Sequence, residues 1–199
     1  MIFSEWVVFG ILLFMYLLLA VLNPFLLRLN IFIRQFILLT RPLQLRPLMV
    51  ITHRYNDVLS LSLQLILLSL LMGFYWDDWR RAMVLTSAMF IQTTAVTATK
   101  QLAAATRPPQ DIAHVKMRSG SYPSGHSAAS MTFALLVPTM LAPYLPTAAI
   151  IAITCYLFFV AIVTAYGRLF LDVHWLSDII GAWLISPATW LIARGFLRV

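Results

Sequence analysis

Long apolar runs, separated by short polar or proline-containing breaks, dominate the pattern of hydrophobic and polar positions along this 199-residue chain. An α-helix needs about 20 apolar residues to cross the hydrocarbon core of a bilayer. Six runs approach that length, so the pattern predicts an all-α fold, a polytopic membrane helical bundle of about six transmembrane helices. We expect these helices at Phe3–Leu22, Val58–Trp76, Ala82–Ala105, Ser127–Leu145, Thr147–Gly167 and Val173–Arg194.

The third predicted helix is more polar than the others. It carries the hydroxyl and amide side chains of Thr86, Ser87, Gln92, Thr93, Thr94, Thr97 and Thr99. Such side chains in membrane helices usually face other helices and not lipid. We therefore expect this helix to be central in the bundle.

The segment from residue 24 to residue 54 departs from the pattern. It remains apolar, but prolines interrupt it, and basic residues recur at Arg28, Arg34, Arg41, Arg46 and Arg54. We interpret it as one or two interfacial helices whose Arg side chains reach the lipid headgroups. A plain connecting loop is the alternative. The chain is then a single membrane-embedded domain, residues 1–199, with its motif-bearing core at about residues 82–194.

Composition agrees with a membrane protein. Hydrophobic residues make up 61% of the chain and charged residues 11%, whereas average soluble domains have roughly a half and a quarter. The net charge of +7 is carried almost entirely by Arg, which indicates contact with the anionic headgroups of the bilayer or with a phosphorylated substrate. The chain lacks the aromatic-basic interleaving of single-strand binders, so no nucleic acid is expected as a partner, and no obligate protein partner is inferred.

Three polar clusters stand out from this apolar background, because ionisable groups near a bilayer are costly and are candidates for function. The first is Lys100 and Arg107, followed by Pro108. Seven residues make about two helical turns, so both cations are expected on one helix face at the membrane boundary. They can form a phosphate clamp, or they can be two snorkelling residues that mark the interface.

The second cluster is Tyr-Pro-Ser-Gly-His at residues 122–126, directly before an apolar helix. Ser124 is a favourable N-cap residue, and the unpaired N–H groups of a helix N-terminus bind anions. Gly125 lets a ligand approach the backbone, and His126 in the first turn can reach the same anion. The alternative is a capped helix start with a passive histidine.

The third cluster is Arg168, His174 and Asp178. The i, i+4 spacing of His174 and Asp178 near the start of the last helix stacks them on one face, where the carboxylate can orient the imidazole toward a substrate. A zinc site is the competing use of these residue types. It fits poorly, because the chain has no Cys pair or carboxylate cluster and cations crowd the same ends, so neither a metal nor another cofactor is expected.

Six spans place all three clusters on the same side of the membrane, and together they resemble the motifs of the type 2 phosphatidic acid phosphatase superfamily of membrane lipid phosphatases. The matches are Lys-x6-Arg-Pro at residues 100–108, Pro-Ser-Gly-His at residues 123–126 and Arg-x5-His-x3-Asp at residues 168–178. One position departs from the pattern. The family often has Ser before the third-motif Arg, where this chain has Gly167, so a hydroxyl contact to phosphate could be lost.

The resemblance implies a role for each matching residue. His174 attacks phosphorus and forms a phosphohistidine, Asp178 orients His174, and His126 protonates the leaving oxygen and then activates water. The phosphoryl oxygens are held without a metal, by Lys100, Arg107, Ser124, Gly125 and Arg168.

The chain is thus expected to be a metal-independent membrane lipid phosphatase or diphosphatase, with undecaprenyl diphosphate as the leading substrate. Phosphatidic acid and phosphatidylglycerophosphate are close alternatives, and Lys116 and Arg118 could meet a second phosphate. A lipid phosphotransferase would use the same residues. A non-enzymatic lipid-phosphate binder would need only the cations.

Two indications of sidedness disagree. Most basic residues outside the clusters lie on the motif side, which the positive-inside rule would make cytoplasmic. The resemblance instead implies a protein of the bacterial inner membrane with its active site facing the periplasm. We follow the resemblance, because active-site cations and interfacial Arg distort the count.

Overall fold

The computed structural model describes residues 2–109, 117 and 119–198. Within them the chain forms helices, turns and loops and no strand, which confirms the predicted all-α class. The α-helices are α1 Phe3–Leu22, α2 Leu27–Thr40, α3 Arg46–Tyr55, α4 Val58–Leu70, α5 Trp79–Ala103, α6 Gly125–Leu141, α7 Thr147–Phe170 and α8 Leu176–Leu197. Short helical turns, η1 Asn23–Leu26 and η2 Leu43–Leu45, precede α2 and α3, and a π-helical turn, η3 Leu71–Tyr75, extends α4.

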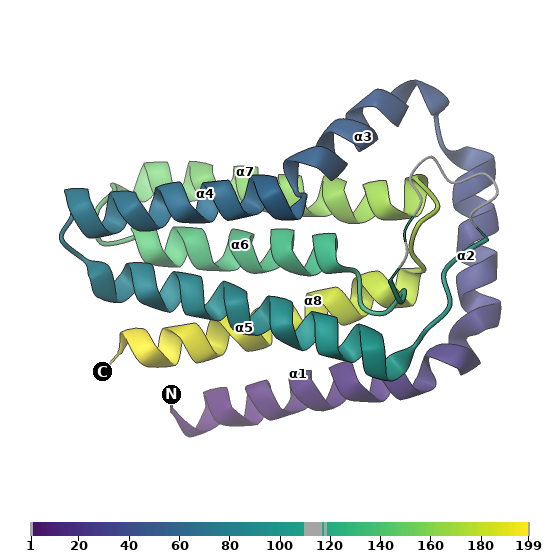
Figure 1. Cartoon of the computed structure of the whole chain (residues 1–199), viewed down its shortest axis with the longest axis horizontal. Coiled ribbons are helices and arrows are strands. Elements are labelled where there is room, and N and C mark those ends of the chain that lie inside the picture. The colour runs from purple at the N-terminus through teal and green to yellow at the C-terminus, as the bar shows by residue number, and fades with distance from the viewer. Residues whose placement is uncertain (1, 110–116, 118, 199) are drawn as a thin grey trace.

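Helices α1 and α4 to α8 lie roughly along the long axis of the molecule (Figure 1). In the described part of the chain, five helical stretches are long and apolar enough to cross a membrane, namely Phe3–Thr40, Val58–Tyr75, Trp79–Ala103, Thr147–Phe170 and Leu176–Leu197. Helix α6, the remaining predicted span, has 17 residues and packs against α5, α7 and α8. The structure therefore confirms a helical membrane bundle.

The core is centred on α6. Buried side chains occupy all sides of this helix, among them those of Ala128, Ala134, Leu136 and Met140. The prediction that α5 is central was wrong, because much of α5, including Thr93 and Thr97, is exposed. Thr86 and Thr99 hydrogen-bond to Ser69 of α4 and Tyr16 of α1, but a hydroxyl group on a helix can also bond to its own helix and then needs no neighbour. Thr97 Oγ1, for example, donates to the carbonyl oxygen of Thr93 at 2.8 Å.

The segment between α1 and α4 is helical, which rules out the plain loop that was the alternative. Helix α2 runs across the end of the bundle, and α3 returns obliquely toward α7 (Figure 1). Pro47 stands in the first turn of α3, where its missing N–H would have had no helical partner in any case. The membrane-interface location of α2 and α3 stays a prediction.

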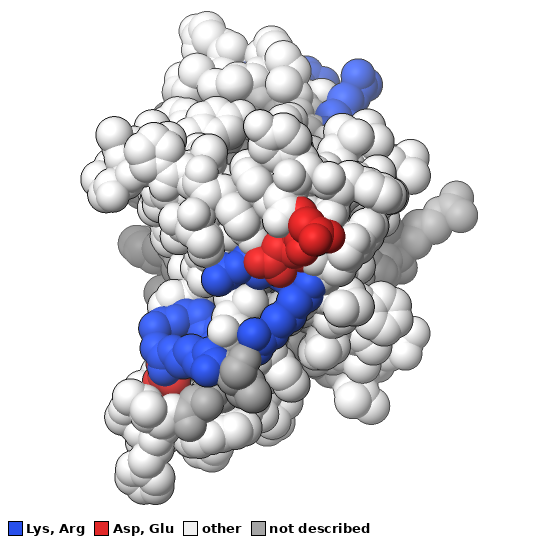
Figure 2. Space-filling model, turned by 90° about the vertical axis from the view of Figure 1, so that its left-hand side faces the viewer, with Lys and Arg blue, Asp and Glu red and all other residues white. Residues whose placement is uncertain are grey.

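The two ends of the bundle differ in what they hold. The C-terminal ends of α5 and α7 and the N-terminal ends of α6 and α8 meet at the end covered by α2 (Figure 1). The opposite end is shown in Figure 2, where basic and acidic side chains lie next to each other. Ion pairs there join Arg81 to Asp78 at 3.2 Å and Arg198 to Glu5 at 2.7 Å. All three polar clusters of the sequence therefore lie at the α2 end.

Candidate active site

Asp178, in the first turn of α8, connects the segments of the site. Its side chain is fully buried, and its Oδ2 accepts hydrogen bonds from the backbone N–H of Trp175 at 2.8 Å and from the hydroxyl of Ser121. Its backbone carbonyl accepts from the N–H of Ser124 at 3.1 Å. The first turn of a helix leaves N–H groups unpaired and favours a carboxylate. Asp178 therefore holds the start of α6 against the start of α8.

His174 lies in the loop before α8, so the prediction that it shares a helix face with Asp178 was wrong. The loop follows a turn at Asp172, whose φ of 59° is incompatible with continuation of α7. The pair is nevertheless formed, with His174 Nδ1 at 3.0 Å from Asp178 Oδ2. On the other side of the ring, Arg107 Nη1 lies 3.2 Å from His174 Nε2.

These two contacts favour one tautomer of His174. A carboxylate can only accept a hydrogen bond and a guanidinium can only donate one, so the hydrogen belongs on Nδ1 and the lone pair on Nε2. Burial, reinforced by the nearby cations of Arg168 and Arg107, lowers the pKa of His174 well below its ordinary value. The imidazole is therefore neutral at neutral pH and has a nucleophilic nitrogen.

Lys100 and Arg107 converge on one loop although they do not share a helix. Helix α5 ends before Ala104, which has a left-handed φ of 43°, so the predicted two-turn arrangement was wrong. Lys100 Nζ donates to the carbonyl oxygen of Gly120 at 2.9 Å, and Arg107 Nη2 donates to the same oxygen at 3.1 Å. Gly120 approaches α5 so closely that a Cβ there would lie 2.7 Å from the Lys100 carbonyl oxygen. The close approach brings both cations to the second cluster.

Ser124, Gly125 and His126 form the start of α6. Ser124 is the N-cap, with its Oγ accepting from the N–H of Ser127 at 3.5 Å. A Cβ at Gly125 would meet no atom closer than 3.9 Å, so the backbone here remains accessible. The buried Nε2 of His126 has no hydrogen-bond partner among the described residues and lies 3.9 Å from Asp57 Oδ1. This nitrogen is free to interact with a substrate oxygen.

Arg168, in the last turn of α7, is 1% exposed. Its Nη1 lies 2.7 Å from His53 Nδ1, while its Nε and Nη2 have no hydrogen-bond partner within the described part of the chain. A buried guanidinium with unpaired N–H groups is suited to bind an anion. His53 comes from α3, and its ring lies 4.7 Å from that of His126, centre to centre. It was not among the predicted site residues, because no motif surrounds it.

Helix α2 holds the loop that carries His174. Arg34 makes two hydrogen bonds to the carboxylate of Asp172, both of 2.7 Å. Asn30 donates to the hydroxyl of Ser177 at 2.9 Å and accepts from the N–H of Ser177 at 3.2 Å. These contacts fix the loop on both sides of His174. Sequence reasoning missed them, and the available signal was the recurrence of polar residues within an apolar segment.

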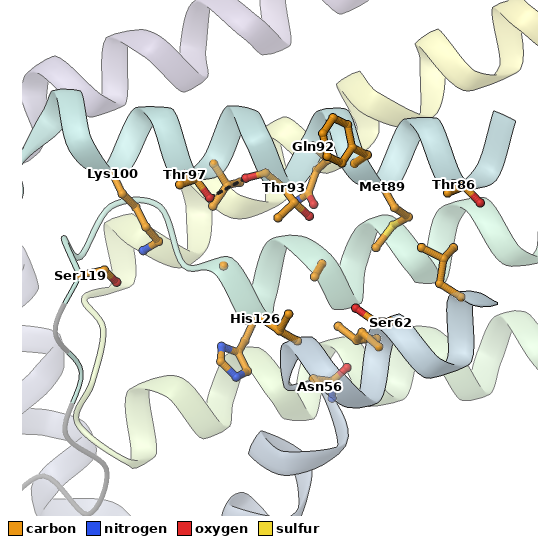
Figure 3. A pocket seen from close by; sticks show the side chains of 17 residues that line it. Asn56, Ser62, Thr86, Met89, Gln92, Thr93, Thr97, Lys100, Ser119 and His126 are labelled. Atoms are coloured by element: carbon orange, nitrogen blue, oxygen red, sulfur yellow. Dashed lines mark hydrogen bonds between the residues drawn. The ribbon is translucent and has the colours of Figure 1, made fainter. Parts of the chain in front are cut away.

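A cavity of about 490 Å³ between α4, α5 and α6 adjoins the site (Figure 3). Lys100 and His126 stand at one end of it, and from there it follows α5 past Thr97, Thr93 and Gln92. Leucines and other apolar side chains make up most of the remaining wall, including Leu61, Leu65, Met89, Phe90, Val96 and Ala129. The cavity therefore joins a cationic end to a mainly apolar interior.

The described residues contain no group of three or more His, Cys, Asp or Glu side chains that could hold a metal ion. Cations and histidines surround the site instead. Lys116 and Arg118, which were predicted to meet a second phosphate, lie outside the described residues.

Known proteins resemble this chain in sequence pattern and in fold. The pattern of the PAP2 superfamily matches residues 81–198. Among solved structures, a transmembrane PAP2-type phosphatidylglycerolphosphate phosphatase from Bacillus subtilis superposes with a TM-score of 0.87 at 19% identity, covering 96% of each chain. LpxE from Aquifex aeolicus superposes with a TM-score of 0.64 at 20% identity, covering 84% of this chain and 95% of its own. At such identities the two structures establish the fold alone. No curated protein sequence matches the chain.

Proposed function

The chain belongs to the PAP2 superfamily, which makes it a phosphoric-ester hydrolase, and we propose that it removes phosphate from a membrane lipid through a phosphohistidine at His174. The observation that carries the proposal is the setting of this imidazole. Asp178 holds Nδ1, Arg107 faces Nε2, and Arg168 has N–H groups without a hydrogen-bond partner among the described residues.

In the first step, His174 Nε2 attacks phosphorus and the bond from phosphorus to the lipid oxygen breaks. The developing negative charge on the phosphoryl oxygens is offset by Lys100, Arg107 and Arg168, after Arg107 has turned from His174 Nε2 to the phosphate. His126, protonated once the anionic phosphate is bound beside it, gives this proton to the leaving oxygen, because a lipid alkoxide is a poor leaving group. Asp178 stabilises the positive charge that develops on the imidazole.

In the second step, water attacks the phosphohistidine and His126 takes its proton. The bond between nitrogen and phosphorus breaks, inorganic phosphate leaves, and His174 returns to the neutral tautomer held by Asp178. The N-cap Ser124 and the accessible backbone of Gly125 support a role for the α6 N-terminus in binding the phosphoryl oxygens. Lys100, Arg107 and Arg168 offset the negative charge of the phosphoryl group in both steps, so we propose that no metal takes part.

The cavity beside the site supports a lipid substrate. Its mainly apolar wall fits hydrocarbon chains, and its cationic end fits the phosphate. Thr97, Thr93 and Gln92 place polar groups along the same wall. An ester oxygen of a glycerophospholipid can accept a hydrogen bond from Gln92, whose Nε2 has no partner among the described residues, whereas a polyprenyl chain cannot. We therefore favour phosphatidylglycerophosphate or phosphatidic acid over undecaprenyl diphosphate as the substrate.

Release of inorganic phosphate from purified lipids tests the function. The purified protein in detergent is given phosphatidylglycerophosphate, phosphatidic acid and undecaprenyl diphosphate, each with and without excess EDTA. We expect the protein to turn over a glycerolipid. This turnover should be unchanged in excess EDTA and inhibited by added vanadate. Turnover lost in EDTA and restored by a divalent metal would contradict the metal-free mechanism, and faster turnover of undecaprenyl diphosphate would contradict the substrate preference.

Trapping separates an enzyme from a lipid-phosphate binder. A short pulse of radiolabelled substrate followed by alkaline quenching is expected to leave acid-labile label on His174 and none on His174→Ala. Binding of the labelled lipid without covalent label or released phosphate would favour the binder. Transfer of label to an added lipid acceptor in place of water would favour a phosphotransferase.

We propose that the site faces the periplasm of a bacterial inner membrane, on the strength of the family resemblance. Two single-cysteine variants in a Cys155→Ser background test this. Thr40→Cys lies at the α2 end and Asp77→Cys at the opposite end, and both positions are exposed. In intact cells a membrane-impermeant maleimide should label Thr40→Cys and spare Asp77→Cys, and the reverse pattern would place the site in the cytoplasm.

A further inference from the structure

We propose that His53 is a positioning residue of this site, which accepts a hydrogen bond from Arg168 and so aims the remaining guanidinium N–H groups at the phosphate. The inference rests on the proposed function. It gives a role in the reaction to α3, which lies in a segment without any of the three motifs.

The contact itself is short and buried. Arg168 Nη1 and His53 Nδ1 are 2.7 Å apart, and the whole Arg168 side chain is shielded from solvent. Guanidinium groups are planar and rigid, so fixing one nitrogen fixes the directions of the others. Nε and Nη2, which have no hydrogen-bond partner among the described residues, are the groups left for the substrate. Without an acceptor at His53, the same plane could rotate away from the phosphate.

The packing of α3 on α7 brings His53 into reach. A Cβ placed at Gly167 would lie 3.4 Å from Met49 Sδ and 3.6 Å from Thr52 Oγ1, so α3 touches α7 directly beside Arg168. At the C-terminal end of α3, Asn56 donates to the hydroxyl of Thr164 on α7 at 2.8 Å. Gly167 thus lies at the contact between α3 and α7, where a Cβ would be at ordinary van der Waals distance from α3.

The contact requires neutral His53, because Nδ1 must offer a lone pair to the guanidinium. Three other elements present ionisable groups to this ring: Arg168 from α7, His126 from α6 and Asp57 at the start of α4. Arg54 follows on α3 itself. Burial, with Arg168 as the next contribution, lowers the pKa of His53. The neutral form therefore persists below the ordinary histidine pKa, and acidification would replace the hydrogen bond with two adjacent cations.

A matched pair of variants separates the hydrogen bond from the packing of the ring. His53→Phe keeps a ring against His126 and removes the acceptor. His53→Asn removes the ring and can present its side-chain oxygen near the position of Nδ1. Arg54→Gln is the control, because Arg54 is an exposed neighbour on α3 and contributes less to the pKa of His53 than burial and Arg168 do. Each variant is assayed for kcat and KM on a lipid phosphate, for its thermal midpoint in detergent, and for the rise of that midpoint with vanadate.

We expect His53→Phe to lose about tenfold to a hundredfold in kcat/KM, the range for a hydrogen bond to a charged group. Its thermal midpoint should stay near that of the wild type, and its response to vanadate should weaken. His53→Asn should recover most of the rate, and Arg54→Gln should match the wild type. The acid limb of the kcat/KM profile should be less steep in His53→Asn, because asparagine does not titrate.

Two results would overturn the inference. One is a wild-type rate and vanadate response in His53→Phe. The other is an equal loss in both variants together with lowered thermal midpoints, which would make His53 a packing residue of α3. A wild-type protein that releases no phosphate would instead refute the proposed function. The vanadate response of the two variants would still decide whether His53 positions an anion-binding Arg168.

Discussion

Helices α5 to α8 and helices α1 to α4 contribute to the same site in different ways. The C-terminal half supplies the candidate nucleophile His174, its partner Asp178, His126 and the cations proposed to bind phosphate. Several of these residues contact one another directly, as His174 contacts both Asp178 and Arg107. The predicted chemistry is therefore contained in one half of the chain.

The N-terminal half reaches the same residues from outside. Arg34 and Asn30 of α2 hold the loop around His174, and His53 of α3 holds Arg168. Helix α1 contacts the site less directly. The hydroxyl of Tyr122, which precedes the Ser124–His126 segment, donates to the backbone carbonyl of Tyr16 at 2.6 Å. The difference between the halves suggests that one carries the reaction and the other determines how accurately its groups are placed. Substitutions in the C-terminal half should then abolish or strongly lower turnover, and substitutions in the N-terminal half should lower it only partly.

The largest effect is expected from His174→Ala, which should abolish turnover and covalent labelling. No other described side chain has a neutral nitrogen held between a carboxylate and a guanidinium at the centre of the site. Phosphate release and a pulse-label experiment measure the effect, and a thermal melt in detergent checks the fold. Substantial turnover by a folded His174→Ala protein would remove the nucleophile assignment.

Asp178→Asn should lower kcat by a hundredfold or more, since loss of the orienting carboxylate costs about four orders of magnitude in a serine protease triad. Asparagine can present its NH2 group to Nδ1, which favours the wrong tautomer of His174. Asp178 also accepts from Trp175 and Ser121, so part of the loss comes from the local structure. Near-full turnover, measured beside a thermal melt, would show that the His–Asp pair is structural.

Arg34→Gln tests the supporting half and should lower kcat by about tenfold. Asp172 is 1% exposed and would lose a bidentate partner. Breaking a fully buried pair costs about 3–5 kcal/mol, and the cost should be smaller here because the Arg34 side chain is 21% exposed. The readouts are kcat and the thermal midpoint.

Arg28→Gln is the matched control on α2, because Arg28 is exposed. We expect it to leave both readouts unchanged. Equal effects of Arg34→Gln and Arg28→Gln would mean that α2 acts through its overall charge and not through the loop of His174.

Tyr122→Phe should give the smallest change in rate. It removes the hydroxyl that reaches α1 but keeps the ring, which fills the space beside Gly181. A loss of about 1 kcal/mol in stability is expected for one hydrogen bond, with kcat within about threefold of the wild type. Chemical or thermal unfolding and steady-state kinetics measure the two quantities. A large loss of kcat without a loss of stability would place α1 in the reaction itself.

The sequence alone determined the membrane bundle and the three clusters. Apolar length is a direct requirement of the bilayer, so the predicted limits of α1 agree with the structure and those of α5 differ by a few residues. The motif residues are close enough in sequence for their spacing to be informative. The number and order of the predicted spans were then sufficient to predict that the three clusters lie at one end of the bundle.

Only the tertiary structure decided how these residues meet. Ala104 and Asp172 have left-handed backbone conformations that follow the helices α5 and α7, so Arg107 and His174 reach the site from loops and not from helix faces. Likewise, α6 is central because α5, α7 and α8 pack around it. Hydropathy alone does not specify which helices become neighbours. The contacts of Arg34 and His53 join residues more than 100 positions apart. Such contacts leave no local pattern in the sequence, since each partner alone is an ordinary polar residue in an apolar segment.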